Sequence, residues 1–521
     1  MFLCQPLLDV LIARGIEDID SFIQPPSWND LPDPESIPGM ADAADRVLAA
    51  VRDMKRIAIF GDYDCDGILG THILRSVLAS LGVQARAYLP HRDEGYGISS
   101  FAVHKFSLSG TDLLITVDNG INAQREILLA QRLGVDVIVI DHHRIQQQQA
   151  NTLAVWSQEF CGAGLAALFA MELALRAGWK GERVERLQAA MSQYAAIASV
   201  ADCVPLQNGT RTLARLGMRA LARAENCGLQ ELLRVSCADP ANPDSNDLAF
   251  GVAPRINAAG RIDHPAAALS VFEAARDEDA ARRSVERLDQ LNQQRRQLVA
   301  THFGGLCTEI PQPGPSALVL YGESCPKGIA GLLAAKCVER FRVPSIVMAP
   351  APDPGLAVGS GRSVPGFDLA QALEQFRRFF KRFGGHAQAV GLTMPIGQIE
   401  AFAKEFTAFV EGLNLQRNHE TCEDGELVLA TAGKHFDEQL ALLEPFGEGN
   451  PAPVFLLRGV EVASLRNRWV RIRQGRFSLE ALCWDLAPRV GMRGSALIEF
   501  RGKRRVLKCF REGDRQGSRA I

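Results

Sequence analysis

The sequence predicts an α/β protein of several domains, built around a doubly wound parallel sheet and ending in a small β-barrel. Its 521 residues correspond to about three to four domains at roughly 150 residues each. Short, continuous apolar runs alternate with helical patterns in the first half, and alternating strand patterns fill the last hundred residues. With 47% hydrophobic and 22% charged residues, the composition is that of an ordinary globular protein. No apolar run reaches 18 residues, so no membrane span is expected.

Neither the N-terminal segment nor the cysteines indicates export. Residues 1–18 lack a basic stretch followed by an apolar core and a small-residue cleavage site. The twelve cysteines include no pair with C-x-x-C spacing, which argues against a zinc ribbon or a redox motif. We therefore expect reduced thiols in a cytoplasmic, monomeric protein without a membrane partner.

The parallel sheet is predicted by three apolar runs, over residues 57–60, 113–117 and 135–140. They are continuous rather than alternating, as strands buried on both faces should be. Between the first two, apolar residues recur at every fourth position from Leu69 to Leu81, and Gly82 follows as a helix stop. Alternation of strands and helices is typical of a parallel, doubly wound sheet.

Downstream of this domain the pattern changes twice. Residues 268–303 contain neither glycine nor proline and predict a long helix that connects two lobes. A second α/β pattern follows, with strands expected at 317–321 and 345–348, and alternation such as that over 469–473 predicts the barrel. The expected divisions are a helical cap (1–55), the first α/β domain (56–265), the connecting helix (266–304), the second α/β domain (315–415) and the barrel domain (420–521).

The charge is unevenly distributed along the chain. The net charge is −3, but residues 458–521 carry 16 Lys and Arg against 6 Asp and Glu, which is +10. The remaining residues therefore carry −13. A basic C-terminal segment on an acidic body fits a polyanionic partner, and it fits a solvated basic tail equally well on charge alone.

Acidic side chains follow each of the predicted buried strands. Because ligands bind at the C-terminal edge of an open α/β sheet, side chains from separate strands should converge there. An aspartate after a helix, in Ser199–Pro205, is a further contributor. The candidate residues are Asp62, Asp64 and Asp66 after the first strand, Asp118 after the second, Asp141, His142 and His143 after the third, and Asp202.

This residue set predicts a site for divalent metal ions. Clustered carboxylates repel one another and raise one another's pKa values unless cations neutralise them. Oxygen ligands with an occasional imidazole suit Mg²⁺ or Mn²⁺ better than Zn²⁺. Two such ions about 3.5–4 Å apart are a common device for phosphodiester hydrolysis. A calcium loop starting at Asp62 is excluded, because its twelfth position is Ile73 rather than glutamate.

The sequence resembles the DHH phosphoesterases and, among them, the RecJ single-strand exonucleases. The resemblance covers nearly the whole chain and lies in motifs that occur in the family's order. Besides the acidic motifs these are His91-Arg92 with Glu94-Gly95-Tyr96-Gly97, Cys161-Gly162-Ala163-Gly164, Ala253 to Arg261, Gly359 to Ser363, Gly384 to Ala387, and Pro445 to Pro451.

The resemblance implies a DHH domain, a connecting helix, a DHH-associated domain and an oligonucleotide-binding (OB) barrel. It implies 5′ to 3′ hydrolysis of single-stranded DNA to mononucleotides with Mn²⁺ or Mg²⁺, in DNA repair and recombination, beside a helicase and a single-strand-binding protein. Two cations would be held by Asp62, Asp64, Asp66, Asp118, His142 and Asp202, with Asp118 bridging. His143 would contact the scissile phosphate and Asp141 would orient the histidines. DNA contacts would come from Arg92, Arg255, Asn257, Arg261, Ser360, Arg362 and His386.

Two segments depart from the family pattern, and two other functions stay open. The proline and the Asn-Pro that usually follow the DHH motif are absent between Arg144 and Phe160. Where relatives carry Trp-His-Pro/Gln-Gly, this chain has Cys325-Pro326-Lys327-Gly328, so that Lys327 would supply the missing positive charge. One alternative is a DHH phosphodiesterase acting on short oligonucleotides or dinucleotides, although the basic barrel suits a longer substrate. The other is a metal-free scaffold that only binds single strands, which the complete set of acidic residues disfavours.

Overall fold

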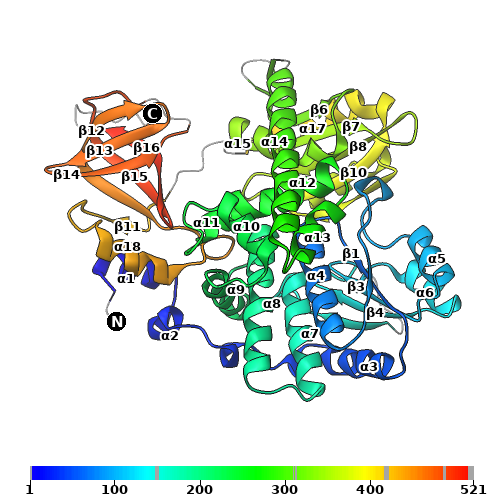
Figure 1. Cartoon of the computed structure of the whole chain (residues 1–521). Helices are drawn as coiled ribbons and strands as arrows, with labels where there is room; N and C mark the ends of the chain where they lie inside the picture. Colours follow the sequence, from blue (N-terminus) through cyan, green and yellow to red (C-terminus); the bar gives the residue numbers. More distant parts are fainter. Residues whose placement is uncertain are drawn as a thin grey trace.

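The computed structural model describes residues 3–146, 152–308, 310, 314–415, 422–484 and 488–513. Figure 1 shows two α/β units beside a long helix, α14 (Glu278–Thr308), with a β-barrel on the opposite side of the molecule. A group of helices, α8 to α11, lies between the barrel and the first α/β unit. Within the described residues, no helix combines the length and the apolar character needed to cross a membrane.

The first unit contains the predicted parallel sheet. Its strand order is β2-β1-β3-β4-β5, and every pairing is parallel. The strands are β1 (Ile57–Gly61), β2 (Arg86–Tyr88), β3 (Leu113–Val117), β4 (Asp136–Asp141) and β5 (Leu153–Trp156). Gly61 pairs with Val117, and Val117 with Ile140, so the strands end level with one another. The acidic residues that follow them therefore meet at one edge.

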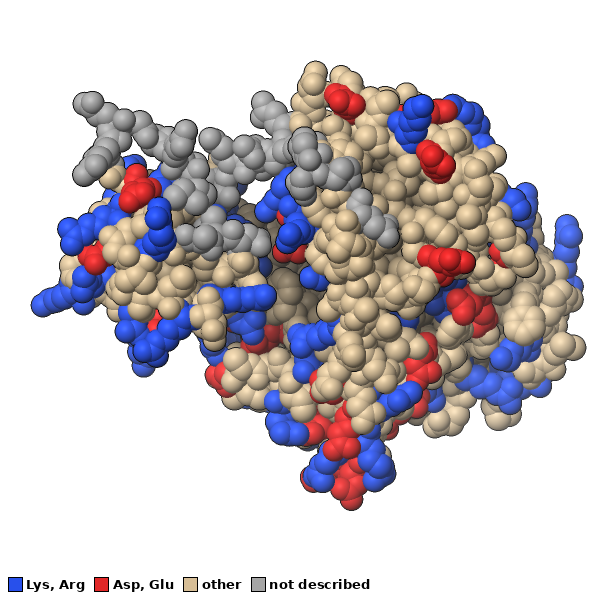
Figure 2. Space-filling view, turned by 90° about the horizontal axis from the view of Figure 1, so that it is seen from above, with Lys and Arg blue, Asp and Glu red and all other residues tan. Residues whose placement is uncertain are grey.

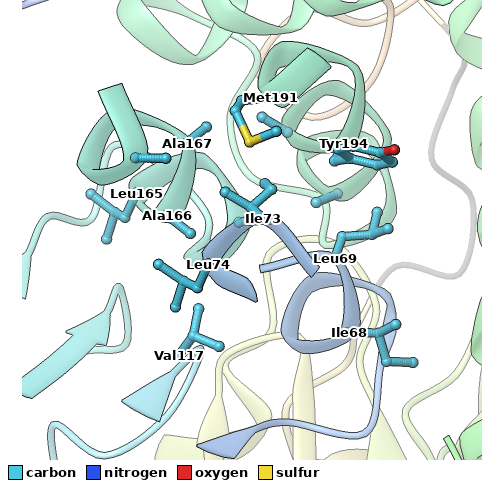
Figure 3. Close-up of a cluster of buried hydrophobic side chains, with 14 of the residues drawn as sticks. Ile68, Leu69, Ile73, Leu74, Val117, Leu165, Ala166, Ala167, Met191 and Tyr194 are labelled. Atoms are coloured by element: carbon cyan, nitrogen blue, oxygen red, sulfur yellow. The ribbon is translucent and has the colours of Figure 1, made fainter. Parts of the chain in front are cut away.

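Helices cover both faces of this sheet. On one face, α3 (Met40–Arg52), α4 (Cys65–Ser80) and α7 (Gly162–Arg176) pack on the odd-numbered apolar residues of β1 and β3. On the other face, α5 (Ser100–Leu108) and α6 (Gln124–Arg132) cover the alternate residues. Figure 3 shows Leu74 and Ile73 of α4 between Val117 of β3 and the side chains of α7 and α8 (Glu182–Ala201), with Leu69 beside Tyr194 of α8. The helix predicted from the four-residue repeat is thus α4.

The region expected to form one connecting helix contains two. Helix α13 (Ala266–Glu273) ends before Ala274, and α14 starts at Glu278, where the carboxylate of Asp277 accepts a hydrogen bond from the Ala280 amide (2.9 Å). Asp277 thus caps the new helix, which explains the break in an otherwise helix-forming sequence. Helix α14 alone spans the distance between the two α/β units.

The second α/β unit has a mixed sheet, in the order β6-β7-β8-β10-β9. Its strands are β6 (Leu318–Tyr321), β7 (Ser345–Pro350), β8 (Leu356–Arg362), β9 (Arg382–His386) and β10 (Ala389–Pro395). Only β6 and β7 run parallel; the other pairings are antiparallel. Helices α15 (Ala330–Phe341) and α17 (Ile399–Gly412) pack against it.

The C-terminal strands form a closed barrel, as predicted. The strands are β12 (Val454–Arg466), β13 (Trp469–Gln474), β14 (Phe477–Leu482), β15 (Arg493–Arg501) and β16 (Arg504–Glu512). The order β12-β13-β14-β16-β15 closes through pairing of β12 with β15, and the short β11 (Gly425–Glu426) adds to β12. A five-stranded barrel of this kind is an OB fold.

The N-terminal 55 residues contribute to two separate cores rather than forming one cap. Leu7, Val10 and Leu11 of α1 (Gln5–Ala13) pack among the apolar residues of the barrel. Met40 and Val47 of α3 instead pack on the parallel sheet. In the proline-rich segment between them, Trp28, Leu31 and Ile37 pack with the core of the parallel sheet.

The barrel is joined to the first unit by a buried polar junction that includes Glu444. Arg211 of α9 (Asn208–Leu221) donates a hydrogen bond to the Glu444 carbonyl (2.7 Å). The Glu444 carboxylate accepts one from the Phe446 amide (3.0 Å), while its Oε1 is buried and has no hydrogen-bond partner. Burial, together with the nearby charge of Asp244, raises the pKa of Glu444 to about 7.

This raised pKa predicts a loss of stability with increasing pH. Between pH 4.5 and 7 the folded protein binds more protons at Glu444 than the unfolded chain does, so the free energy of unfolding falls as pH rises through this range. The contribution is on the order of 3 kcal/mol. Glu444→Gln cannot ionise, and its stability relative to the wild type should increase from pH 5 to pH 8 in urea unfolding experiments. Glu438→Gln, on the exposed surface of the same segment, is the control. A stability difference that stays constant over this range would contradict the assignment.

Candidate metal centre and nucleic-acid groove

The predicted metal ligands lie together at the C-terminal edge of the parallel sheet. Asp62 follows β1, Asp118 follows β3, and Asp141 is the last residue of β4. Asp202 reaches the same place from the C-terminal end of α8, where it is the capping residue. Four separate elements thus bring acidic side chains to one position, as the strand pattern predicted.

The turn after β1 is held by its own aspartates. Asp64 caps α4, its Oδ1 accepting hydrogen bonds from the amides of Asp66 (3.1 Å) and Gly67 (3.2 Å). The buried carboxylate of Asp66 accepts hydrogen bonds from the amides of Gly162 (2.6 Å) and Ala163 (2.8 Å), at the N-terminus of α7. The helix N-terminus stabilises this negative charge, which fixes Asp66 in place.

Asp118 occupies the centre of the cluster. Its φ of +60° lies in the left-handed region, an unfavourable conformation that is typical of functional sites. Its Oδ1 is 3.2 Å from Nε2 of His142, and the same Nε2 is 3.6 Å from a carboxylate oxygen of Asp202 and 3.7 Å from one of Asp66. A side chain at residue 162 would place its Cβ 2.7 Å from the Cβ of Asp118, so glycine is required there.

These residues form two neighbouring groups of potential ligands, Asp62, Asp64 and Asp118 in one and Asp66, His142 and Asp202 in the other. A third group, of Asp118, His142 and His143, shares one residue with each of them; within each group the ligand atoms lie within 4.8 Å of one another. Asp118, in contact with His142, stands between them. The Oδ1 atom of Asp62 is buried without a hydrogen-bond partner. Such an orphaned oxygen fits a cation ligand, and the donor set fits Mn²⁺ or Mg²⁺.

The electrostatics also fit bound cations. Burial, and then the charges of the neighbouring carboxylates, raise the pKa of Asp62, Asp118 and Asp202 well above the ordinary value. Burial also lowers the pKa of His142, which favours the neutral imidazole that a metal requires. Divalent cations would supply the positive charge that this cluster needs in order to ionise fully.

His143 and Asp141 form a separate hydrogen-bonded pair. Nδ1 of His143 lies 2.7 Å from Oδ1 of Asp141, and that carboxylate also accepts hydrogen bonds from the amides of Ile121, His142 and His143. Burial opposes a charge on His143, but the hydrogen bond and the charges of nearby aspartates outweigh it and raise its pKa. Asp141 therefore holds the ring of His143 and the backbone of His142, and its role in orienting both histidines stays a prediction.

Sequence reasoning gave no role to Tyr96, which contacts this pair. Its hydroxyl lies 2.9 Å from Nε2 of His143 and donates to the carbonyl of Asp118 (3.3 Å). The Gly-Tyr-Gly sequence around it was visible, but the sequence does not indicate that the loop folds back onto β3.

Beside the metal ligands, predicted DNA-binding arginines form a cationic cluster between the two α/β units. Arg261 of α12 (Ala253–Ile262) donates to the Gly328 carbonyl (3.1 Å), which joins the two units. Burial, and then the charges of Arg92, Arg295 and Arg362, lower the pKa of Arg261 to about 9. Guanidinium groups gathered closely enough to lower one another's pKa are typical of a phosphate site.

The other residues of this cluster are held in place by local contacts. Arg362 donates to the Ser360 hydroxyl (3.1 Å) on β8. Arg92 donates to the Gly260 carbonyl (3.0 Å), and its guanidinium lies 4.0 Å from the centre of the Tyr63 ring. The Nζ of Lys327 donates to the carbonyl of Arg92 (2.8 Å), so Lys327 does bring a positive charge to this place.

Three predicted DNA contacts have other surroundings. Oδ1 of Asn257 accepts a hydrogen bond from the Cys65 amide (2.8 Å), so this side chain supports the acidic turn. Arg255 forms an ion pair with Asp289 of α14 (2.9 Å). His386 is exposed at the end of β9, and Ala389 of β10 separates it from Arg362. DNA contacts from these three remain predictions.

Fold and site together define a metal-dependent phosphoesterase of the DHH class. Three family models match the chain: the DHH family N-terminal domain at residues 56–200, the DHHA1 domain at 314–412 and the RecJ OB domain at 423–494. The three matches coincide with the first α/β unit, the second α/β unit and the barrel.

Curated relatives identify the family within the DHH class to which the chain belongs. The single-stranded-DNA-specific exonuclease RecJ of Dickeya dadantii is 34% identical over 475 residues, which are 85% of this chain and 81% of that protein. The RecJ protein of Bacillus subtilis is 31% identical over 88% of this chain, which spans 59% of that longer protein. The crystal structure of RecJ in complex with Mn²⁺ from Thermus thermophilus covers 99% of this chain and 75% of its own, with a TM-score of 0.83 and 26% identity. The chain belongs to the RecJ family of single-stranded-DNA-specific exonucleases.

Replacing the central aspartate should separate metal binding from folding. Asp118→Asn removes the charge of a residue that belongs to one ligand group and contacts His142 of the other, so Mn²⁺ affinity measured by calorimetry should fall by more than about 100-fold. Because a repelling buried charge is also lost, the melting temperature of the metal-free protein should rise. Asp136→Asn, at the opposite end of β4, should change neither quantity. Unaltered Mn²⁺ affinity in Asp118→Asn would refute the two-ion assignment.

The close approach of α7 to Asp118 gives a second test. In Gly162→Ala the new methyl group would lie 2.7 Å from the Cβ of Asp118, so Asp118 must move and nuclease activity should fall at least about 100-fold. Gly304→Ala, in an open position on α14, should keep full activity and gain up to about 1 kcal/mol of stability. Activity assays and urea unfolding of both variants provide the comparison, and a fully active Gly162→Ala would show that the contact is unimportant.

Proposed function

We propose that this protein degrades single-stranded DNA from the 5′ end and releases mononucleotides, using two divalent cations at the sheet edge. The observation that carries the proposal is the position of a cationic cluster, with Ser360 and Arg362, directly beside the two ligand groups. A site that binds a terminal phosphate next to the cleavage site selects a strand end, and removes one nucleotide at a time.

Each part of the site has a task in this reaction. Bound by Asp62, Asp64, Asp118, Asp66, His142 and Asp202, the cations supply Lewis acidity, which polarises the phosphodiester and makes water a better nucleophile at neutral pH. His143, whose pKa is raised, presents a proton and a positive charge to a non-bridging phosphate oxygen. Asp141 holds that imidazole, and the Tyr96 hydroxyl contacts its other nitrogen. Arg92, Arg261 and Arg362 hold the terminal phosphate in place.

The composition of the barrel surface favours a long substrate over a dinucleotide. Several of its cations are paired, among them Arg471 with Glu480 and Arg505 with Asp437, so part of the positive charge stabilises the fold. Arg468 lies 4.6 Å from the centre of the Trp484 ring, and both side chains are exposed. An exposed aromatic ring beside an arginine is a suitable platform for stacked bases, which a short substrate does not need.

The proposal has consequences for the cell. An enzyme that accepts only single strands needs another activity to separate the duplex, so a helicase and a single-strand-binding protein are the partners we propose. We also propose that it works as a cytoplasmic monomer in DNA repair and recombination, since one chain contributes all the residues of the site.

Polarity tests this function directly. The protein should release mononucleotides first from the 5′ end of a single strand, measured with 5′- and 3′-labelled substrates in Mn²⁺. Arg362→Ala removes a phosphate contact and should lower kcat/KM for 5′-phosphorylated strands by about 10- to 100-fold. Arg377→Ala, an exposed arginine paired with Glu374, should behave like the wild type. Release that starts from the 3′ end would overturn the proposal.

A further inference from the structure

A π-helix carries an exposed aromatic residue between the metal centre and the barrel. It spans Leu248–Val252, between α11 (Ser245–Asp247) and α12. Pro254 has no N–H, so it cannot form the α-helical hydrogen bond to the carbonyl of Phe250. The amide of Ala253 donates to the carbonyl of Leu248, five residues back, which is the hydrogen bond of a π-helix. This widening places Phe250 outward with 56% of its surface exposed. Single π-turns of this kind are frequent at functional sites.

The position of this turn is fixed by close packing on its other side. A Cβ at Gly251 would lie 2.3 Å from the carbonyl oxygen of Ser236, the last residue of α10 (Cys227–Ser236). The backbone is therefore held against α10, and the Gly251 carbonyl accepts a hydrogen bond from Arg255 (2.9 Å). Phe250 is thus exposed on a rigid support, which reduces the entropy cost of stacking a ligand on it.

A row of guanidinium groups leads from the phosphate cluster to this turn. The charges of Arg295 and Arg362 help to lower the pKa of Arg261, and after burial the charges of Arg296 and Arg255 lower the pKa of Arg295, so these guanidinium groups lie near one another. Arg295 comes from α14, and its Nε is buried without a hydrogen-bond partner. Such a row can neutralise successive phosphates of a strand.

The barrel approaches Phe250 from the opposite side. The guanidinium of Arg501, at the end of β15, lies 6.0 Å from the centre of the Phe250 ring. In the following turn, Lys503 binds Asp239 (2.8 Å) and the backbone of the same segment, which fixes the barrel against the first unit. Figure 2 shows a hollow between the smaller lobe and the main body, with Lys and Arg side chains on both of its sides.

We propose that Phe250 stacks on a base of the single strand where the strand passes from the metal centre to the barrel. The inference rests on the proposed function and adds a positioning residue to it. The alternative, that Phe250 serves only as a structural partner of Arg501, has weaker support. The separation of 6.0 Å is at the limit of a cation–π contact, and Arg501 already forms an ion pair with Glu499 (2.8 Å). The ring face remains open to a base.

The test compares Phe250 with an exposed phenylalanine far from the hollow. Phe101 on α5 is 68% exposed and lies at the opposite side of the molecule from the barrel. Binding of a long 5′-phosphorylated single strand is measured in EDTA, so that no cleavage occurs. Phe250→Ala should weaken it by about 5- to 100-fold, the range for loss of one stacked base, whereas Phe101→Ala should not.

A second readout does not depend on affinity. Addition of the same strand to Phe250→Trp should quench the added indole fluorescence, relative to the wild type, and Phe101→Trp should show no such change. With Mn²⁺, Phe250→Ala should cut a dinucleotide as fast as the wild type but a long strand more slowly.

These experiments distinguish a failure of the stacking proposal from a failure of the proposed exonuclease function. Phe250 variants that bind, fluoresce and cut like their Phe101 controls would overturn the stacking role while leaving the exonuclease intact. A wild-type protein that binds the strand in EDTA but does not cut it in Mn²⁺ would overturn the proposed function. The binding comparison would still decide the role of Phe250.

Discussion

Aspartates buried within a few ångströms of one another repel, and the structure around the sheet edge is arranged to keep them there. The N-terminus of α7 donates two amides to Asp66, and Asn257 accepts the amide of Cys65 in the acidic turn. Asp118 is held in the left-handed region, and only glycine fits opposite it at residue 162. These contacts fix positions but leave the charge uncompensated, since the pKa values remain raised. The site is therefore preorganised for cations, which gain most of their binding energy from charges that are already assembled.

The sequence predicted the parts of this arrangement that depend on local patterns. Continuous apolar runs identified β1, β3 and β4, and the polar residues after them had to meet because parallel strands end at the same edge. Tyr96 and Arg295 were missed for a common reason. The contact of Tyr96 with His143 depends on a loop conformation, and the place of Arg295 depends on where α14 crosses the groove. Neither leaves a periodic signal. The division of the N-terminal segment between two cores could not be predicted either, because the apolar residues of a short helix do not indicate which core the helix packs against.

Helix α14 connects the two α/β units through its backbone and through the charged side chains that it carries. Asp289 pairs with Arg255 of the first unit, and Arg295 acts on Arg261, whose guanidinium donates to Gly328 of the second unit. A single helix thus contacts both units and adds positive charge beside Arg261. Because the same arginines would hold phosphate, a bound polyanion would relieve their mutual repulsion.

The packing of α1 against the barrel domain has a consequence for the synthesis of the chain. The Cys4 amide donates to Gln439, and Arg14 forms an ion pair with Asp424. These contacts join residues more than 400 positions apart. During synthesis the apolar face of α1 emerges early, whereas the barrel-domain residues that pack with it are translated more than 400 residues later. The parallel sheet can condense while α1 still lacks its partner. Completion of the barrel domain is therefore a late step in folding that depends on contacts between distant residues. Until it occurs, the ribosome-bound chain exposes Leu7, Val10 and Leu11. These apolar side chains are a target for chaperones that shield nascent hydrophobic segments.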